Sequence, residues 1–368
     1  MVNMKEIFAF ERISNQECEL APLSERELSS ALLEDGDLLF ARQSLTFEGA
    51  GKCVLVLPAD GPRTWESHLI RVRLDKIMAC PAFYYYYFNS IQGRLSVQTI
   101  VQQVAAAGIR GSDLSRLSVP FPAIEVQWGI SDVLGALDDK IAANTQLAET
   151  TAELAALTYS SFQAMRGDRH PLDELVTTQY GFTTSAHSEP GPKFLRVTDI
   201  NKRPWITWFS TPNCSLGAAD LAKYRVREGD ILVARMADPG KAAFIDEGDP
   251  EAVFASYLVR LKAKDPEDAL FIYYFLRSDE YRNYSEGAMQ GSVQMNMNAK
   301  VIVATDMFLP NREGITLFNS RIRPLRRVIQ SALTENVQLA ATRDALLPQL
   351  MSGKLRVKDA EQTLAGVL

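Results

Sequence analysis

Side chains able to do chemistry are few and widely spaced in this 368-residue chain. The 3 histidines, His68, His170 and His187, stand apart from one another, which favours incidental over catalytic roles. The neighbouring carboxylates Asp138 and Asp139 fall in a predicted helix, where a solvated or partner-facing surface is the simplest interpretation. The sequence has no Gly-x-x-x-x-Gly-Lys-Ser/Thr phosphate loop and no Asn/Asp-Pro-Pro-aromatic run that could hold a flipped base. These observations predict a chain without a catalytic centre of its own.

Amide side chains suited to contacting base edges are concentrated in residues 289–298. Polar and apolar residues alternate there, so one face could present several amides. Gln and Asn can pair bidentately with adenine, and Arg or Lys with guanine. The alternative is a surface loop or edge strand whose amides are simply solvated.

The candidate DNA-reading residues form two sets, one in each half of the chain. The set in the second half is Tyr180, Thr183, Thr184, Ser185, Lys241, Gln290, Ser292, Gln294, Asn296 and Asn298. The set in the first half is Arg42, Gln43, Ser44, Lys52, Gln102, Gln103 and Arg110. Arg42 and Arg235 end matching predicted strands, so a structural role is equally open for both of them.

Composition limits the class of protein. The chain is 46% apolar and has a net charge of −6, which is typical of a globular protein and argues against a uniformly basic nucleic-acid coat. A local basic surface is still compatible with these values. The 4 cysteines are scattered without ligand-like spacing, so we predict no metal site and no disulfide framework. With no signal-peptide run at Met1, a reduced, cytoplasmic setting fits best.

A helical seam that must position these candidates occurs twice. The second copy has a four-three spacing in Phe318, Ile322, Leu325, Ile329, Ala332, Asn336, Leu339, Arg343, Leu346 and Leu350. The first copy lies 188 residues earlier, in Ile130, Leu134, Leu137, Ile141, Asn144, Ala148, Thr151, Ala155, Thr158 and Phe162. Each set shares one face of a long helix. We predict helices at about 123–166 and 313–352, with Pro324 and Pro348 kinking or shortening the second and Gly353 ending it.

The segments before the two helices also repeat each other, which predicts two similar lobes. Residues 35–42 match 228–235, and Gly51-Lys52 matches Gly240-Lys241. The second lobe has a leader, residues 172–192, for which the first lobe has no counterpart because it begins where that leader ends. The predicted organisation is a first lobe at 1–122, a spacer helix at 123–166, a second lobe at 167–310, a spacer helix at 311–358 and a loose tail at 359–368.

The two helices are predicted to pack against each other, because neither seam is apolar enough to be stable alone. Opposite net charges on the two helices favour the pairing. If Ile130 lies opposite Leu350, antiparallel partners have residue numbers that add up to 480, and Asn144 faces Asn336. A buried Asn pair would fix the register. The alternative is that both asparagines face solvent or a partner protein.

Three segments resemble the specificity subunit of type I restriction-modification systems. They are Leu137-Asp138-Asp139-Lys140-Ile141-Ala142-Ala143-Asn144, Leu346-Leu347-Pro348-Gln349-Leu350-Met351-Ser352-Gly353-Lys354-Leu355-Arg356-Val357 and Tyr180-Gly181-Phe182-Thr183-Thr184-Ser185. The likeness covers nearly the whole chain. It implies an α+β fold in which two similar α/β target recognition domains are separated by two long antiparallel, coiled-coil-like helices with approximate two-fold symmetry.

The resemblance also implies a function and partners. Each lobe would read one half of a bipartite double-stranded DNA site, and the helices would set the spacer and dock two adenine-N6 methyltransferase (modification) subunits. Restriction/translocase subunits would join them in a phage-defence complex. The chain itself would be non-catalytic and without a cofactor, while S-adenosylmethionine, ATP and Mg would belong to the partner subunits. The alternatives are a half-functional subunit acting mainly as a protein scaffold, and an enzyme with an unrecognised site. The missing first leader departs from the family pattern.

Overall fold

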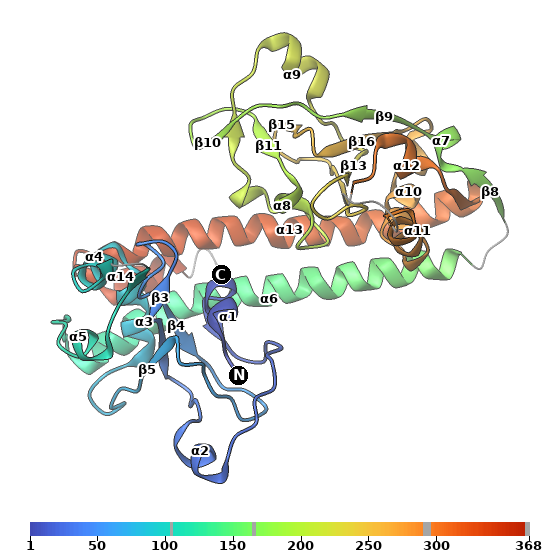
Figure 1. Cartoon of the computed structure of the whole chain (residues 1–368). Helices are drawn as coiled ribbons and strands as arrows, with labels where there is room; N and C mark the ends of the chain where they lie inside the picture. Colours follow the sequence, from blue (N-terminus) through green and yellow to red (C-terminus); the bar gives the residue numbers. More distant parts are fainter. Residues whose placement is uncertain (104–105, 164–166, 290–295, 365–368) are drawn as a thin grey trace. The chain divides into compact units, whose positions relative to one another are not determined.

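The computed structural model describes residues 1–103, 106–163, 167–289 and 296–364 (Figure 1). It forms two compact units, one made of Met1–Ala143 with Gln338–Leu368 and the other of Asn144–Val337. The two long helices are α6 (Ile124–Phe162) and α13 (Arg312–Met351), and each contributes one part to each unit. The α+β fold with two long helices is therefore confirmed. The domain limits at 122, 166, 310 and 358 stay predictions, since each unit includes a part of each helix.

The first unit contains two small sheets beside helices. Its main sheet has the order β1-β4-β2-β5, and a second sheet has the order β3-β7-β6. The strands are β1 (Arg12–Ile13), β2 (Leu38–Ala41), β3 (Gln43–Ser44), β4 (Cys53–Val56), β5 (Leu69–Val72), β6 (Gln102–Gln103) and β7 (Ala107–Gly108). The shorter helices are α1 (Met4–Ala9), α2 (Glu25–Ser30), α3 (Pro81–Asn89), α4 (Ile91–Gln98), α5 (Gly111–Leu114) and α14 (Val357–Leu364).

The second unit has three sheets. Their orders are β14-β13-β16-β9, β10-β12-β11-β15 and β17-β8. The strands are β8 (Gly167–Pro171), β9 (Val176–Tyr180), β10 (Ala186–His187), β11 (Lys193–Leu195), β12 (Asn213–Cys214), β13 (Asp230–Ala234), β14 (Ala242–Phe244), β15 (Ala252–Phe254), β16 (Leu258–Ala263) and β17 (Asp306–Pro310). The helices are α7 (Leu172–Leu175), α8 (Val197–Ile200), α9 (Ala218–Tyr224), α10 (Ala269–Leu276), α11 (Asp279–Met289) and α12 (Ala299–Val303), with 3-10 turns at Trp208–Ser210 and Pro266–Asp268.

Matching hydrogen bonds show that the two lobes repeat each other. Before β2, the Asp37 carboxylate accepts from the Glu34 amide at 2.8 Å, and before β13 Asp230 accepts from the Arg227 amide at 2.9 Å. The glycine before each of these aspartates has a positive φ, 86° and 84°, a conformation that favours glycine. The repeat predicted from the sequence is thus confirmed at the level of individual turns.

The aromatic run that predicts a core helix forms α3, and its four tyrosines are buried. In the second unit the fully buried α10 takes the same place. Both helices pack into cores that also contain one part of α6 and one part of α13. Each lobe is therefore built onto the helix pair, because the aromatic helix and the seam residues share one hydrophobic core.

Within each unit the two long helices pack antiparallel in the predicted register. In the second unit the rings of Phe162 and Phe318 are 5.4 Å apart, and their numbers add up to 480. In the first unit Arg343 Nη1 donates at 2.7 Å to Oδ1 of Asp138, which directly follows Leu137, the partner of Arg343 in that register. Pro324 and Pro348 both lie inside α13, which ends at Met351 just before Gly353, where φ is +70°.

The predicted loose tail at 359–368 is wrong for the part that the structure describes. Residues Val357–Leu364 form α14, and Ala360 and Leu364 are buried in the core of the first unit. Val357 packs closely beside Gly129 of α6. The apolar residues of this segment recur at helical spacing, so it forms a short amphipathic helix that packs on the core. The overall polarity of the segment had instead favoured a loose tail.

The leader of the second lobe forms an extra strand. In Figure 1 strand β9 lies beside β16, and Tyr180 pairs antiparallel with Val259. In the first unit β5 ends its sheet, and no second partner strand is found among the described residues. Ile70 and Val72 of β5 are half-buried, whereas the equivalent Val259 and Leu261 are fully buried. Among the described residues, β5 is therefore paired along one side only, through β2.

Candidate nucleic-acid interface

Tyr180 ends β9 and is tied to the segment that contains the predicted amides. Its hydroxyl accepts a hydrogen bond from the Ala299 amide at 2.9 Å, while 44% of the residue stays exposed. Asn296 and Asn298 directly precede this contact, and the Met297 amide donates to the Arg235 carbonyl at 2.9 Å. The structure thus brings Tyr180, Asn296 and Asn298 together, although they come from the two ends of the lobe.

Asn298 has a structural role in this cluster. It is the N-cap residue of α12, and its Oδ1 accepts from the Val301 amide at 3.0 Å. An N-cap bond of this kind stabilises a helix by about 1 kcal/mol. The side chain is exposed, so its amide nitrogen can still face a partner. Gln290, Ser292 and Gln294 lie outside the described residues.

The segment after Tyr180 is held against β15. The Phe182 amide donates to the Phe254 carbonyl at 2.8 Å, and a Cβ at Gly181 would meet the Ala255 carbonyl oxygen at 2.2 Å. Glycine is therefore required where the chain passes so close to this backbone. Thr183 and Ser185 follow as exposed residues, and Thr184 is half-buried.

Lys241 lies on the connection that leads into β14. Its carbonyl accepts from the Ala234 amide at 2.8 Å, and its side chain is exposed. Ala234 ends β13, so Lys241 and Arg235 are held on one hairpin.

The first lobe gathers its candidates in the small sheet β3-β7-β6. Gln43 and Ser44 form β3, which pairs with Gly108 and Ala107. Gln102 lies on β6, which pairs with the same strand, and the side chain of Gln103 is outside the described set. Arg42 immediately precedes β3 and is exposed. This part of the candidate set therefore forms one polar surface patch.

Lys52 belongs to the first set but has a partner within the protein. Its ammonium donates to the Phe8 carbonyl at 3.3 Å and lies 5.4 Å from the centre of the Phe8 ring. Burial lowers the pKa of Lys52, and Arg94 adds to this effect, although Glu11 opposes it. Because the Lys52 ammonium group already makes these contacts within the protein, it is a weaker candidate for a contact with DNA. Arg110, the N-terminal cap position of α5, is exposed.

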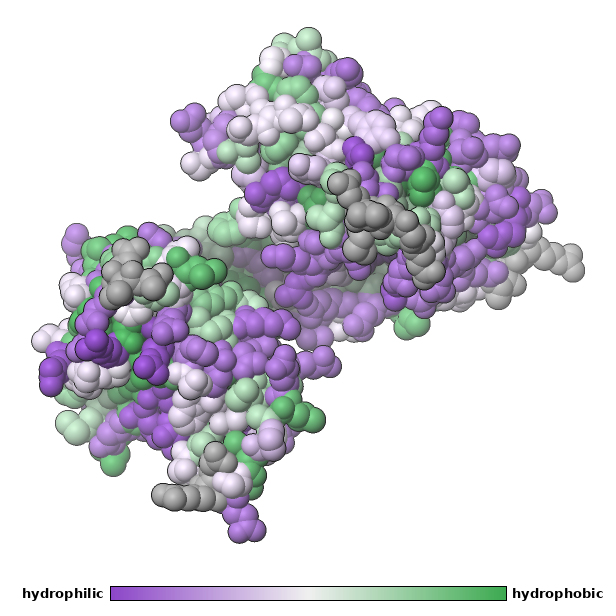
Figure 2. Space-filling view, in the orientation of Figure 1, coloured by the Kyte–Doolittle hydropathy of each residue, from purple (hydrophilic) through white to green (hydrophobic). Residues whose placement is uncertain are grey.

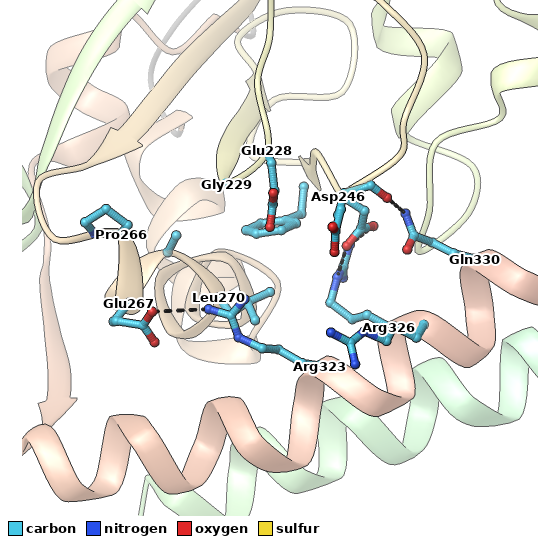
Figure 3. A pocket seen from close by; sticks show the side chains of 13 residues that line it. Glu228, Gly229, Asp246, Pro266, Glu267, Leu270, Arg323, Arg326 and Gln330 are labelled. Atoms are coloured by element: carbon cyan, nitrogen blue, oxygen red, sulfur yellow. Dashed lines mark hydrogen bonds and ion pairs between the residues drawn. The ribbon is translucent and has the colours of Figure 1, made fainter.

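A cavity of about 370 Å³ lies beneath the second lobe, and Figure 3 shows its charged wall. Arg326 of α13 donates to Asp246 through Nε at 2.7 Å and Nη2 at 2.5 Å. Arg323 pairs with Glu267 at 3.4 Å, and Gln330 donates to the Glu247 carbonyl. These charged and polar contacts connect loops of the second lobe to α13. The cavity therefore lies at the contact between the lobe and this helix, which we call the joint.

Electrostatics at this joint depend on burial. Burial disfavours the charged form of Arg326, but Tyr273 and Asp246 outweigh it, so the pKa of Arg326 is raised. Burial also raises the pKa of Asp249 to about 6, although Asp249 accepts hydrogen bonds from the Asp246 amide and the Trp208 indole. Asp249 could not be identified from the sequence, because the groups that surround it come from separate segments.

The described ranges 1–103, 106–163, 167–289 and 296–364 contain no metal-binding cluster. No group of three or more His, Cys, Asp or Glu side chains is placed to hold an ion there. In that same part of the chain, no helix has the length and apolar character needed to cross a membrane.

Comparison with known proteins connects this geometry to one family. Residues 11–151 match the family model described as the type I restriction modification DNA specificity domain. The chain is 22% identical over 304 residues to the MjaVIII specificity subunit of Methanocaldococcus jannaschii, which covers 74% of this chain and 71% of that protein. It is 33% identical over 106 residues to the EcoKI specificity subunit of Escherichia coli, but these span only 28% of this chain and 23% of that one.

A solved structure has the same fold. The type I S subunit from M. genitalium superposes with a TM-score of 0.54 at 13% identity, covering 93% of this chain and 88% of the other.

Proposed function

We propose that this chain is a specificity subunit of a type I restriction-modification system, which recognises a DNA target in two halves and assembles a modification and restriction complex. One observation carries the proposal. The chain holds two copies of one lobe, and each copy presents a polar hairpin at the end of its central strand, after Ala41 or Ala234. Two similar lobes suit a target made of two separate half-sites.

The chain is a non-catalytic subunit of its family. Its polar hairpins supply arginine, lysine, glutamine and asparagine, which are the side chains that read base edges and phosphates. Methyl transfer and strand cleavage would be the work of partner subunits, which would also hold S-adenosylmethionine, ATP and Mg. This division of labour fits a chain in which every polar cluster described above serves positioning or recognition.

The partner subunits need a surface on the helices, and α6 offers one. Leu147, Leu154 and Leu157 are 49%, 51% and 68% exposed on the half of α6 that belongs to the second unit. Their spacing places them on one face of the helix. The face shown in Figure 2 carries many hydrophilic residues, with groups of hydrophobic residues between them. We propose that this leucine stripe docks an adenine-N6 methyltransferase subunit, with two such subunits per complex.

The experiment that tests this function maps methylated adenines across the genome in cells with and without this protein. A bipartite motif with a fixed spacer, lost in the cells without it, is the expected result. A motif with only one specified half would favour a subunit with one recognition lobe that acts mainly as a scaffold. Unchanged methylation in both strains, with no methyltransferase co-purifying, would refute the proposed function.

A further inference from the structure

Arg235 is held in one orientation at the polar end of the second lobe. Its guanidinium carbon lies 5.0 Å from the centre of the Tyr180 ring, and Nη2 donates to Asn296 Oδ1 at 3.4 Å. The backbone is fixed on both sides, because the Arg235 amide donates to the Tyr257 carbonyl and its carbonyl accepts from the Met297 amide. The guanidinium group of Arg235, which lies against the Tyr180 ring, has therefore lost much of its conformational freedom before any ligand binds.

Most of the donors of Arg235 are still available for a ligand. A guanidinium has five N–H groups, and Asn296 accepts from one nitrogen. The Nε atom is buried and has no acceptor within the described ranges. Nη1 likewise has no acceptor in that part of the chain. A buried donor without an acceptor is destabilising, so a ligand that supplies an acceptor would bind favourably here.

The equivalent residue of the first lobe, Arg42, has different described surroundings. Arg42 occupies the same position, since its carbonyl accepts from the Ile109 amide at 2.9 Å as that of Arg235 accepts from Met297. In the second lobe the ring beside Arg235 belongs to Tyr180 of β9. The described part of the first lobe has no strand equivalent to β9, so no such ring lies beside Arg42 there. Its Nη1 only reaches the Ser67 carbonyl at 3.5 Å, and the side chain is exposed.

We propose that Arg235 is a specificity-determining residue that reads a guanine in the half-site bound by the second lobe. The inference rests on the proposed DNA-recognition function. Two parallel N–H groups of the fixed fork would donate to guanine O6 and N7, the commonest specific contact between a protein and DNA. Tyr180 and Asn296 act as positioning residues, since they fix the orientation of the guanidinium plane of Arg235. The first lobe, with an unstacked Arg42, would read its half-site without this contact.

The test uses the intact complex in cells and compares Arg235→Lys and Arg235→Ala with the wild type. Lysine keeps the positive charge but lacks the planar guanidinium that Tyr180 and Asn296 hold in place. Arg225→Lys is the matched control, because Arg225 lies in the same lobe and makes a surface ion pair with Glu251 at 3.1 Å. The measurement is the relative methylation of targets carrying each base at each position, together with thermal unfolding of the purified complex.

The expected result is that Arg235→Lys lowers the preference for one G·C pair in one half-site by roughly tenfold or more, while other positions keep theirs. Arg225→Lys should leave every position unchanged. If Arg235→Lys keeps the full preference and Arg235→Ala weakens binding to all sequences alike, the contact is to phosphate and the inference is refuted. No effect of either variant also refutes it. A wild type that yields no bipartite motif would refute the proposed function itself.

Discussion

Asp138 and Arg326 occupy the same position in the repeat, 188 residues apart, and carry opposite charges. Each is buried on the face of its helix that supports a lobe. Asp138 Oδ2 accepts from the Tyr86 hydroxyl at 2.8 Å, and the Arg326 guanidinium lies 4.9 Å from the centre of the Tyr273 ring. One lobe is therefore joined to its helix through an acid and the other through a base, so the two joints are not interchangeable.

Removing Asp138 should destabilise the chain much more than removing its neighbour. Asp138→Ala would leave Arg343 and the Tyr86 hydroxyl without their buried acceptor, and we expect a loss of about 3 kcal/mol of unfolding free energy. Asp139→Ala removes an ion pair with Arg12 in which the acid is 74% exposed, so its cost should stay below about 1 kcal/mol. Denaturant unfolding of both variants measures the difference. Equal losses would contradict the buried role of Asp138.

Asp249 should make stability depend on pH between about 4 and 6. Its pKa is raised by burial from the ordinary 3.8 to about 6, so in this range the folded state binds the proton that the unfolded state has released. The contribution of Asp249 to stability therefore falls as pH rises. Asp249→Asn, which cannot ionise, should become more stable relative to the wild type from pH 4 to pH 7. Thermal unfolding across that range tests this, and parallel curves for the two proteins would rule it out.

Gly181 should not tolerate a side chain. Gly181→Ala would push a Cβ against the Ala255 carbonyl oxygen, which the structure places at 2.2 Å, so β9 or its neighbour must shift. We expect a lower melting temperature and weaker recognition of one half-site. Gly287→Ala in α11 is the control, since a Cβ there meets nothing within 4 Å, and it should stabilise the chain by about 0.5–1 kcal/mol. A wild-type melting temperature for Gly181→Ala would show that the close approach is not obligatory.

The leucine stripe on α6 should matter for assembly and not for folding. Leu154→Lys places a charge in the proposed interface, and we expect the affinity for the methyltransferase subunit to fall at least tenfold. Ala156→Lys is the control, because this exposed residue points about 200° away around the helix. Co-purification and unfolding of both variants separate the effects. Full assembly by Leu154→Lys would place the methyltransferase elsewhere.

Local patterns in the sequence predicted the parts that depend on local physics. The seam spacing predicted both long helices, and the register placed Phe162 against Phe318. The asparagines lie at this register, but Asn144 donates to Glu335 at 2.8 Å and Asn336 donates to Thr145 at 3.1 Å. Each asparagine therefore forms a hydrogen bond with the residue next to the other asparagine in the chain. This choice depends on side-chain rotamers, which the spacing of residues in the sequence does not predict.

The candidate interface was predictable only in part. Tyr180 and Asn296 were identified from their type and context, but Arg235 remained open because its contact with Tyr180 forms through the pairing of β9 with β16. A contact between residues so distant in sequence leaves no periodic signal. The helix at Val357–Leu364 was missed because its apolar residues, although at helical spacing, are too few to distinguish a docked helix from a polar tail.

The edge of β5 has a consequence for the behaviour of the protein in the cell. A strand with unpaired backbone groups can recruit other extended chains, which makes it a hazard for aggregation. Arg71 and Arg73 lie on or beside this short strand, and Arg71 stacks on Trp65 at 4.5 Å. Charged residues at such an edge discourage pairing with a second strand. These two charges thus protect the described edge of β5, and replacing both arginines with threonine would expose the first lobe to misassembly during synthesis.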